Sequence, residues 1–449
     1  MKDKQLNCFL LCKTNANMKI LLLGSGGREH ALAWKISQSS QLETLYVAPG
    51  NAGTAEIAKN ISLDVNDFES IGHFTIQNRI DLLVVGPELP LVNGIHDYFK
   101  SNPKLDHVTV IGPEKEAAQL EGSKDFAKEI MKSAKIPTSE YQTFTDINLA
   151  CEYIKSKQLP IVIKADGLAA GKGVTVAETI EQANSAIHDA LEGNVFGNAG
   201  SKVVIEDFLE GEEASILAMI DGENIVLLAS SQDHKRIFEK DLGPNTGGMG
   251  AYSPASIVNK DVEKKVLDRV YKPLLEELKC RNISYKGILY AGLMIKDNDP
   301  YVVEFNCRFG DPETQAVLVR WSGDIIPSII ATINGTLSSD LINWHKQSSA
   351  CVVMVSGGYP AEYKKGYEIQ NIKQANDVLD TFVFQAGTKV DQNKIITDGG
   401  RVLGITSLGE DLEDALSKAY ISVETISYEN AFYRNDIGHH ELRRKKNGI

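Results

Sequence analysis

The chain has 449 residues, of which 43% are hydrophobic and 24% charged, a composition that is ordinary for a folded protein and excludes a fibrous or fully disordered one. The length exceeds that of one typical core, so we expect two to four domains. The formal net charge of -13 argues against a nucleic-acid partner, because binding to a phosphate backbone needs a surplus of clustered Lys and Arg.

Residues 1–17 differ in character from the rest of the chain. Lys2 and Lys4 precede a short apolar run in a faint imitation of a signal peptide. The run is too short, and no small-residue cleavage site comes after it. We expect residues 1–17 to be a non-native or disordered extension, because Met18 opens a far better strand.

From Met18 onward, short apolar runs alternate with more polar, partly helical stretches. The first run enters a Gly-rich turn and is followed by a predicted helix over Ala31–Ser37. Further apolar runs, each soon followed by Gly or Pro, lie at Thr44–Val47, Leu82–Val85 and Val108–Ile111. The pattern predicts a parallel α/β domain over residues 18–120.

The turn from Gly24 to His30 follows a strand and precedes a helix. Its amide groups can therefore hold an anion at the helix N-terminus. A dinucleotide fingerprint is the rival interpretation, but Glu29 stands where that fingerprint has its third Gly or Ala. We expect a single phosphate here.

Residues 121–345 form the second predicted region. Its strand candidates lie at Ile161–Lys164, Lys202–Glu206, Glu213–Ile220, Ile225–Ala229, Leu289–Ile295 and Tyr301–Phe305. These strands follow one another in hairpin-like pairs and do not alternate strictly with helices, which predicts an α+β region. Residues 346–449 contain two more strands and a helix from Leu412, which predicts a small C-terminal domain ending in a solvated basic tail at 443–446.

A Gly-rich loop over Ile161–Val176 joins two predicted strands. Gly167, Gly171 and Gly173 permit close backbone approach, so amide groups can point at phosphate oxygens while Lys164 and Lys172 supply positive charge. The alternative is a plain Gly-rich hairpin with solvated lysines. The loop is not a Walker loop, because no Gly-Lys-Ser/Thr opens a helix.

Glu304 and Asn306 have strand spacing and therefore share one face. An acidic oxygen and an amide oxygen are ligands that Mg²⁺ takes together with nucleotide phosphates. Arg308 continues the same spacing and is placed for a phosphate or a carboxylate. The alternative is a strand edge with a salt bridge. Cys307 alternates to the opposite face, where packing is the expected role.

Two further segments carry polar residues. In Val203–Glu213, a strand, a hinge and the start of a second strand would let an adenine pair with the hinge backbone and Glu213 take ribose hydroxyls; a solvated turn is the alternative. The segment from Gln232 to Gly250 is polar and Gly-rich, which favours an active-site loop or a long surface loop.

Together these segments resemble the glycinamide ribonucleotide synthetase family of the ATP-grasp superfamily. The resemblance covers Met18 to about His439. It rests on Gly24–His30, Pro49–Gly53, Gly86–Glu88, Lys164–Gly173, Gly243–Gly250 and Arg308–Gln315. It implies an N-terminal α/β domain, a central ATP-grasp fold with a mobile lid lobe at about 140–210, and a small C-terminal domain.

The resemblance also implies residue roles. The nucleotide contacts would be Lys124, Lys164, Gly171, Lys172, Gly173, Glu206, Leu209 and Glu213. The metal, Mg²⁺ or Mn²⁺, would be bound by Glu304 and Asn306. The phosphoribosylamine contacts would be Gly24, Gly26, Gly27, Arg28, Gly86, Pro87, Glu88, Asn245 and Gly247. Asp233, Lys235 and Arg308 would line the reaction centre.

The implied reaction is ATP-dependent ligation of glycine to 5-phosphoribosylamine through glycyl phosphate. Another ATP-grasp ligase or carboxylase, an NAD-binding oxidoreductase and a silent nucleotide sensor are the alternatives. We expect small-molecule substrates, no nucleic-acid or membrane partner, and a monomer. Six cysteines without a CxxC pair favour a cytoplasmic location, and no apolar stretch reaches the roughly 18 residues of a membrane span.

Overall fold

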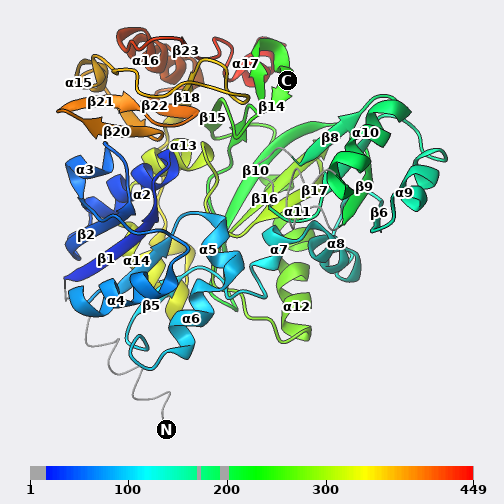
Figure 1. The fold of residues 1–449 in the computed structure, drawn as a ribbon, viewed down its shortest axis with the longest axis horizontal. Coiled ribbons are helices and arrows are strands. Elements are labelled where there is room, and N and C mark those ends of the chain that lie inside the picture. The colour runs from blue at the N-terminus through cyan, green and yellow to red at the C-terminus, as the bar shows by residue number, and fades with distance from the viewer. Residues whose placement is uncertain (1–16, 169–172, 193–201, 448–449) are drawn as a thin grey trace.

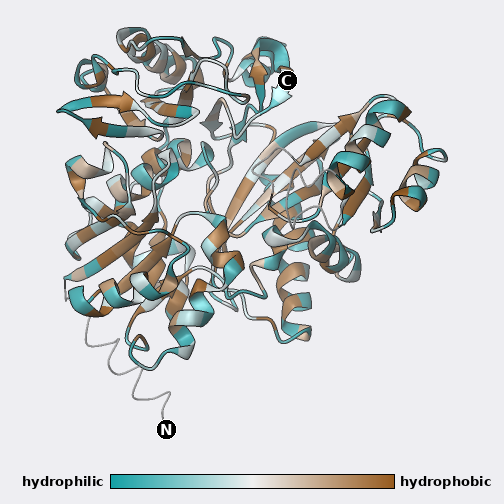
Figure 2. Cartoon of the chain, viewed as in Figure 1, coloured by the Kyte–Doolittle hydropathy of each residue, from teal (hydrophilic) through white to brown (hydrophobic). Residues whose placement is uncertain are grey.

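The computed structural model describes residues 17–168, 173–192 and 202–447. The expected extension at 1–17 therefore lies outside the described residues except for its last position. Three sheet-based regions pack against one another (Figure 1). Apolar residues concentrate along the strands of the sheets, whereas the outward faces of the helices are mostly polar (Figure 2). Within the described residues no helix is both long and apolar enough to cross a membrane.

The N-terminal region is a five-stranded parallel sheet of order β3-β2-β1-β4-β5. Its strands are β1 Met18–Gly24, β2 Leu42–Pro49, β3 Lys59–Asn60, β4 Leu82–Val85 and β5 Thr109–Ile111. Its helices are α2 Gly27–Ser37, α3 Thr54–Ile57, α4 Phe68–Asn78, α5 Glu88–Asn93 and α6 Ile95–Ser101. The prediction of a parallel α/β domain is confirmed.

Strand β1 lies between β2 and β4, so the chain winds outward from it in both directions. Ile20 to Leu23 are fully buried because helices and neighbouring regions cover both faces of the sheet. At such a switch point the loops that follow β1 and β4 leave the same edge of the sheet and enclose a crevice. The Gly24–Arg28 and Gly86–Glu88 turns meet there.

The central region has two antiparallel sheets. The smaller sheet has the order β6-β9-β7-β8, made of β6 Tyr141–Phe144, β7 Ile161–Ala165, β8 Val174–Ala177 and β9 Val203–Asp207. The larger has the order β11-β10-β16-β17, made of β10 Glu212–Ile220, β11 Ile225–Leu227, β16 Gly287–Lys296 and β17 Asp299–Asn306. The predicted α+β character is confirmed by these antiparallel pairs.

Helices cover both central sheets. Those before and within the smaller sheet are α7 Gln119–Gly122, α8 Lys124–Ser133, α9 Ile147–Ile154 and α10 Ile180–Leu191. Those around the larger sheet are α11 Lys260–Val266, η3 Leu267–Tyr271, α12 Lys272–Cys280 and α14 Ile325–Asn334. Helix α13 Glu313–Arg320 packs between α2 and the C-terminal region, and η4 Ser339–Leu341 follows α14. Buried residues of α9, α10, β7 and β9 form a hydrophobic cluster of their own, so the smaller sheet and its helices are a separate lobe.

The C-terminal region is a sheet of order β12-β15-β18-β22-β19, with β23 paired to β18. Its strands are β12 Gln232–Asp233, β15 Gly250–Ser253, β18 Ser348–Ser356, β19 Thr381–Gln385, β22 Arg401–Gly409 and β23 Ala431–Phe432. Two hairpins accompany it, β13 Arg236–Phe238 with β14 Leu242–Asn245 across η2 Glu239–Asp241, and β20 Thr388–Asp391 with β21 Lys394–Thr397. Its helices are α15 Ile372–Asn376, α16 Leu412–Thr425 and α17 His439–Asn447.

Strands β12 and β15 come from the segment that we placed in the central region, yet they pair with the C-terminal sheet. Gly250 lies opposite Val352, about a hundred residues further along the chain. The Gly-rich segment between β12 and β15 is thus held by the C-terminal region at both of its ends.

The expected solvated tail is wrong for Arg444. Its guanidinium forms ion pairs with Glu212 of β10 and with Glu441, and its side chain is 16% exposed. The basic run at 443–446 is therefore part of α17, and Arg444 ties this helix to the central region.

Candidate active site

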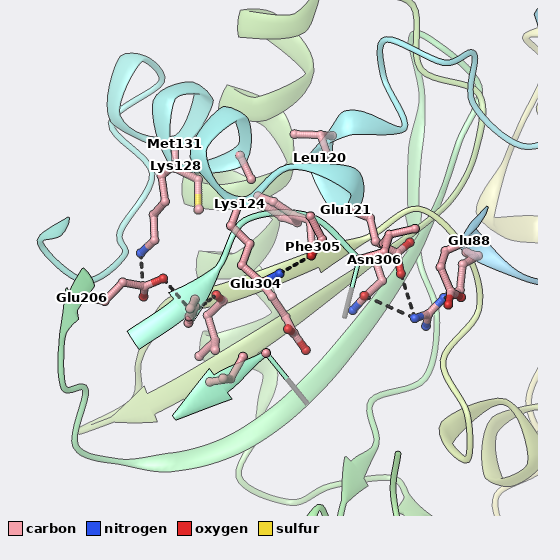
Figure 3. A pocket seen from close by; sticks show the side chains of 18 residues that line it. Glu88, Leu120, Glu121, Lys124, Lys128, Met131, Glu206, Glu304, Phe305 and Asn306 are labelled. Carbon is pink, nitrogen blue, oxygen red and sulfur yellow. Dashed lines mark hydrogen bonds and ion pairs between the residues drawn. The ribbon is translucent and has the colours of Figure 1, made fainter. Parts of the chain in front are cut away.

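A pocket with about 760 Å³ of empty volume, part of it open to solvent, lies between α8, the smaller sheet and β17. Figure 3 shows Lys128 and Glu206 facing each other at one end of it, with Glu121, Asn306 and Glu88 at the other. Besides Glu88, its lining residues are Leu120, Glu121, Lys124, Ala127, Lys128, Met131, Lys164, Gly167, Leu168, Gly173, Val174, Glu206, Val303, Glu304, Phe305, Asn306 and Arg308. The pocket thus has an apolar and an ionic part, the combination that small-molecule sites use for affinity and orientation.

Glu206 of β9 is held between two ammonium groups. Its Oε1 lies 2.7 Å from Nζ of Lys164 and its Oε2 lies 2.9 Å from Nζ of Lys128. Burial opposes ionisation of this carboxyl, but the two lysines outweigh it and lower the pKa of Glu206. Burial lowers the pKa of Lys128 to about 8. The group carries one net positive charge, which suits a polyanionic ligand.

Lys164 also joins the two central sheets, because its Nζ donates to the carbonyl oxygen of Val303 on β17 at 3.1 Å. Lys124 reaches the other side of the pocket, where its Nζ donates to the carbonyl oxygen of Gly167 at 2.7 Å. Gly167 has φ +94, a conformation that favours glycine. The two predicted phosphate lysines therefore line the same pocket. Gly171 and Lys172 lie outside the described residues.

Glu304 and Asn306 both line the pocket, as their spacing on β17 predicts. Burial opposes ionisation of Glu304, but Lys235, Lys164 and Lys124 outweigh it and lower its pKa. Nζ of Lys235 lies 3.9 Å from Oε1 of Glu304. An ionised carboxylate and an amide oxygen on one strand face fit a hard divalent cation better than zinc, which prefers His and Cys.

Arg308 lies two residues beyond the end of β17 and is paired with the chain's own carboxylates. Its Nε lies 3.2 Å from Oε2 of Glu88, and its Nη2 lies 2.8 Å from Oε1 of Glu121. Arg308 and Arg28 lower the pKa of Glu88 to about 2 against the opposing effect of burial. Burial raises the pKa of Glu121 to about 7. Arg308 therefore connects the pocket to the N-terminal region.

The turn after β1 is filled by the side chain of Glu29, a residue in the first turn of the helix α2 that follows it. The amide of Gly26 donates to Oε2 of Glu29 at 2.6 Å, and Nε of Arg28 donates to Oε1 of the same carboxylate at 2.5 Å. A Cβ on Gly86 would lie 2.3 Å from that Oε1, so glycine is required for Glu29 to lie there. In this conformation the Gly26 amide, which the sequence offers to a phosphate, is bonded to Glu29.

Asp233, Lys235 and Glu213 form a second ionic group next to Glu304. Nζ of Lys235 lies 2.6 Å from Oε2 of Glu213. Burial, with the neighbouring carboxylates of Glu313, Glu213 and Glu304, raises the pKa of Asp233 to about 8 against the effect of Lys235. Lys235 therefore contacts both a predicted ribose residue and a predicted metal ligand.

The remaining predicted residues lie away from the pocket lining. Leu209 lies between β9 and β10 and is half-buried. The Gly247 amide donates to the Tyr359 hydroxyl at 3.0 Å, and its carbonyl oxygen accepts from Arg401 at 2.5 Å. Asn245 ends β14 beside it. Arg401 also contacts Asp311, so C-terminal residues position the Gly-rich segment.

Sequence reasoning missed Lys128 and Glu121. Lys128 follows Lys124 by four positions on α8, so both lie on one helix face, and this spacing was a usable signal. Glu121 had none, because its role depends on Arg308, almost two hundred residues away. Cys307 is buried as expected, with its Sγ near the Ala117 carbonyl oxygen.

Comparison with known proteins identifies the family. Three family models of phosphoribosylglycinamide synthetase match the chain, the N domain over 18–121, the ATP-grasp (A) domain over 122–314 and the C domain over 349–440. The chain belongs to the phosphoribosylglycinamide synthetase family. The resemblance stated from the motifs is thereby confirmed, and the ATP-grasp domain of this family implies binding of ATP with a divalent metal.

Relatives of the chain cover nearly its whole length. The chain is 48% identical over 434 residues to the phosphoribosylamine–glycine ligase of Escherichia coli K12, covering 96% of this chain and 100% of the relative. It is 47% identical over 432 residues to the ligase of Vibrio parahaemolyticus, with the same coverage.

Solved structures agree with this family. The phosphoribosylamine–glycine ligase of Thermotoga maritima superposes with a TM-score of 0.81 at 33% identity, covering 93% of this chain and 99% of that one. The biotin carboxylase of Campylobacter jejuni superposes with a TM-score of 0.70 at 14% identity, covering 92% of each chain. The second likeness shows that the fold is shared with the carboxylases.

Proposed function

We propose that this chain ligates glycine to 5-phosphoribosylamine with ATP, giving glycinamide ribonucleotide, ADP and phosphate in purine synthesis. The observation that carries the proposal is the position of Arg308, which lines the pocket of Glu304 and Asn306 and contacts Glu88 of the N-terminal turn. The pocket and the crevice of the N-terminal sheet therefore open onto the same place. The near full-length relatives named phosphoribosylamine–glycine ligase support this assignment.

Lys124, Lys164 and the Gly-rich loop up to Gly173 are the groups that we assign to the ATP phosphates. Glu206 lines the end of the pocket where the adenine would lie, Leu209 would contribute the hinge backbone beyond that end, and Glu213 would take the ribose. Mg²⁺ or Mn²⁺ bound by Glu304 and Asn306 would neutralise phosphate charge.

The reaction begins with attack of the glycine carboxylate on the γ-phosphate of ATP, which gives glycyl phosphate and ADP. The amine of phosphoribosylamine then attacks the carbonyl carbon of glycyl phosphate, displaces phosphate and forms the amide. We assign Lys235, Asp233 and Arg308 to the surroundings of the transferred phosphoryl group, where the positive charges of Lys235 and Arg308 would stabilise its negative charge. No side chain is required as a nucleophile.

The phosphoribosylamine would lie in the crevice of the N-terminal sheet, against the turns Gly24–Arg28 and Gly86–Glu88 and the segment from Asn245 to Gly247. Arg28 is engaged by Glu29 and lies 3.9 Å from Glu88. Binding of a phosphate by Arg28 and the Gly26 amide would therefore compete with Glu29 for both groups.

The lobe formed by the smaller sheet has its own core, and we assign it the role of a lid that excludes water from glycyl phosphate. We further propose that the enzyme acts as a cytoplasmic monomer on small molecules, without a nucleic-acid or membrane partner. The net charge of -13 supports the proposal that the chain has no nucleic-acid partner.

The test is ADP release from Mg-ATP, with phosphoribosylamine generated in place from ribose 5-phosphate and ammonia, in the presence and absence of glycine. Strict dependence on both glycine and the amine is the expected result. ADP release that is indifferent to both would assign the site to another acceptor, such as that of a carboxylase. ATP binding without turnover would assign a sensor instead.

A further inference from the structure

Three metal-ligating side chains meet outside the active site, where α17 lies against η2. His439 and His440 begin α17, and Asp241 ends η2. Oδ2 of Asp241 lies 2.9 Å from Nε2 of His440 and 3.3 Å from Nε2 of His439. Among the described residues this is the one group in which three His, Cys, Asp or Glu ligand atoms all lie within 4.8 Å of one another.

The hydrogen bonding of His439 leaves a nitrogen lone pair directed at the carboxylate. Nδ1 of His439 lies 3.1 Å from the backbone carbonyl oxygen of Asp436, and this contact requires a proton on Nδ1 because a carbonyl only accepts. In the neutral ring Nε2 is then an acceptor. A backbone carbonyl bonded to the far nitrogen is also the usual arrangement of a metal-bound histidine.

Nε2 of His439 and Nε2 of His440 thus both face the same oxygen, Oδ2 of Asp241. The two rings lie against each other with centroids 3.9 Å apart. Without a metal, a proton on Nε2 of His440 makes its contact with the carboxylate. A metal ion that replaces this proton would be shared by both nitrogens and the carboxylate.

The carboxylate is fixed and ionised by a buried partner. Nη1 of Arg434 lies 2.9 Å from Oδ1 of Asp241, which leaves Oδ2 for the two histidines. Arg434 is fully buried and is also paired with Asp436, whose carboxylate lies 2.7 Å from its Nε. Two carboxylates and one guanidinium leave a net negative charge before any cation binds.

The start of α17 is held in place by a further histidine. The backbone amide of Gly438 donates to Nε2 of His234 at 3.0 Å, and the ring of His234 packs 5.6 Å from that of His439. His234 is buried, so it supports the site without being one of the three ligands.

We propose that Asp241, His439 and His440 form a binding site for a transition-metal ion. Zn²⁺ is the expected ion, with water as its fourth ligand. Bonds of about 2.0–2.1 Å in a tetrahedral zinc site put neighbouring ligand atoms about 3.3 Å apart, close to the two separations found here. Two imidazole nitrogens and one carboxylate oxygen select zinc over magnesium. The ligand side chains are 27–38% exposed, so an ion can enter from solvent.

A zinc ion here would fasten α17 to the hairpin that leads into the Gly243–Gly250 segment. The site is separate from Glu304 and Asn306, whose oxygen ligands suit magnesium, and the inference does not depend on the proposed reaction. Zinc binding should therefore raise the thermal stability of the chain, because a ligand of the folded state stabilises that state.

The test uses the full chain, stripped of metal and returned to excess Mg²⁺, and titrated with Zn²⁺ alone against a chromophoric chelator. We expect about one zinc per chain at micromolar free zinc and a melting temperature raised by several degrees. The double variant His439→Gln, His440→Gln should lose both effects. The variant His188→Gln, which changes an exposed histidine on α10 paired with Glu192, should keep them.

Equal zinc binding by the double variant, or no zinc retained by the parent chain at micromolar concentration, would overturn the proposal. If the double variant does not fold, zinc-edge absorption spectroscopy of the zinc-loaded parent decides instead. Two imidazole ligands on the bound zinc are expected. A zinc bound by oxygen alone would place it at another site and refute the assignment.

Discussion

Oε2 of Glu88 at the start of α5 lies 3.2 Å from Nε of Arg308, which follows β17. The same guanidinium lies 2.8 Å from Glu121 at the end of α7. One arginine thus holds two carboxylates from two regions of the chain. Replacing it disturbs the interface between these regions as well as the reaction centre.

Arg308→Met should both destabilise and inactivate the chain. Removal of one partner from a buried ion pair costs about 3 kcal/mol or more, because the remaining charges lie away from water. We expect a clearly lower melting temperature in calorimetry and loss of glycine-dependent ADP release. Arg281→Met is the matched control, since Arg281 pairs with Glu129 and Glu277 at the surface and should cost less than about 1 kcal/mol. Equal stability of the two variants would contradict this account.

Glu304→Gln should abolish turnover without unfolding the chain. The change keeps the side-chain shape and removes the charge that a divalent cation needs, so we expect kcat to fall roughly 100-fold or more. Asp299→Asn at the other end of β17 is the control, because Asp299 pairs with Arg269 and Lys265 outside the pocket. Steady-state ADP release at saturating Mg-ATP measures both. Near-parental kcat in Glu304→Gln would show that the metal lies elsewhere.

Lys128→Met should weaken ATP binding. The Lys128 side chain is 2% exposed and shares Glu206 with Lys164, so its loss removes positive charge and shifts the position of both remaining groups. An effect of about 1–2 kcal/mol corresponds to roughly a tenfold rise in Kd for ATP. Lys132→Met on the exposed face of the same helix should leave Kd unchanged. Isothermal titration with ATP compares the variants, and the same Kd in both would remove Lys128 from the site.

His30 should make the folded state sensitive to acid. Burial lowers the pKa of His30 to about 4 from its ordinary value near 6.5, and its Nδ1 accepts a hydrogen bond from the Gln385 amide at 2.8 Å. Between these two values the unfolded chain binds a proton that the folded chain does not. Stability from this group is therefore complete above pH 6.5 and is lost as the pH falls toward 4, by about 3 kcal/mol in total.

Denaturant unfolding at several pH values measures this slope. His30→Gln keeps a hydrogen-bond acceptor and should flatten the decline between pH 6.5 and about 4. His73→Gln, at an exposed position on α4, should leave the slope unchanged. A slope that does not change in His30→Gln would mean that other groups carry the acid sensitivity.

Features that depend on local spacing could be predicted from the amino-acid sequence. Alternation along a strand placed Glu304 and Asn306 on one face and Cys307 on the other, because successive side chains of a strand point in opposite directions. Apolar runs separated by Gly and Pro indicated the parallel N-terminal sheet. The motifs also indicated the family, which the family models confirmed.

The packing of the three regions determines which charged groups neutralise one another. Glu88 and Glu121 both pair with Arg308, and β15 pairs with β18 as well as with β12. Most of these partners lie far apart along the chain, and no local period encodes them. They are selected because a buried charge or strand edge must find a partner in the packed chain, a requirement that arises only once the regions meet.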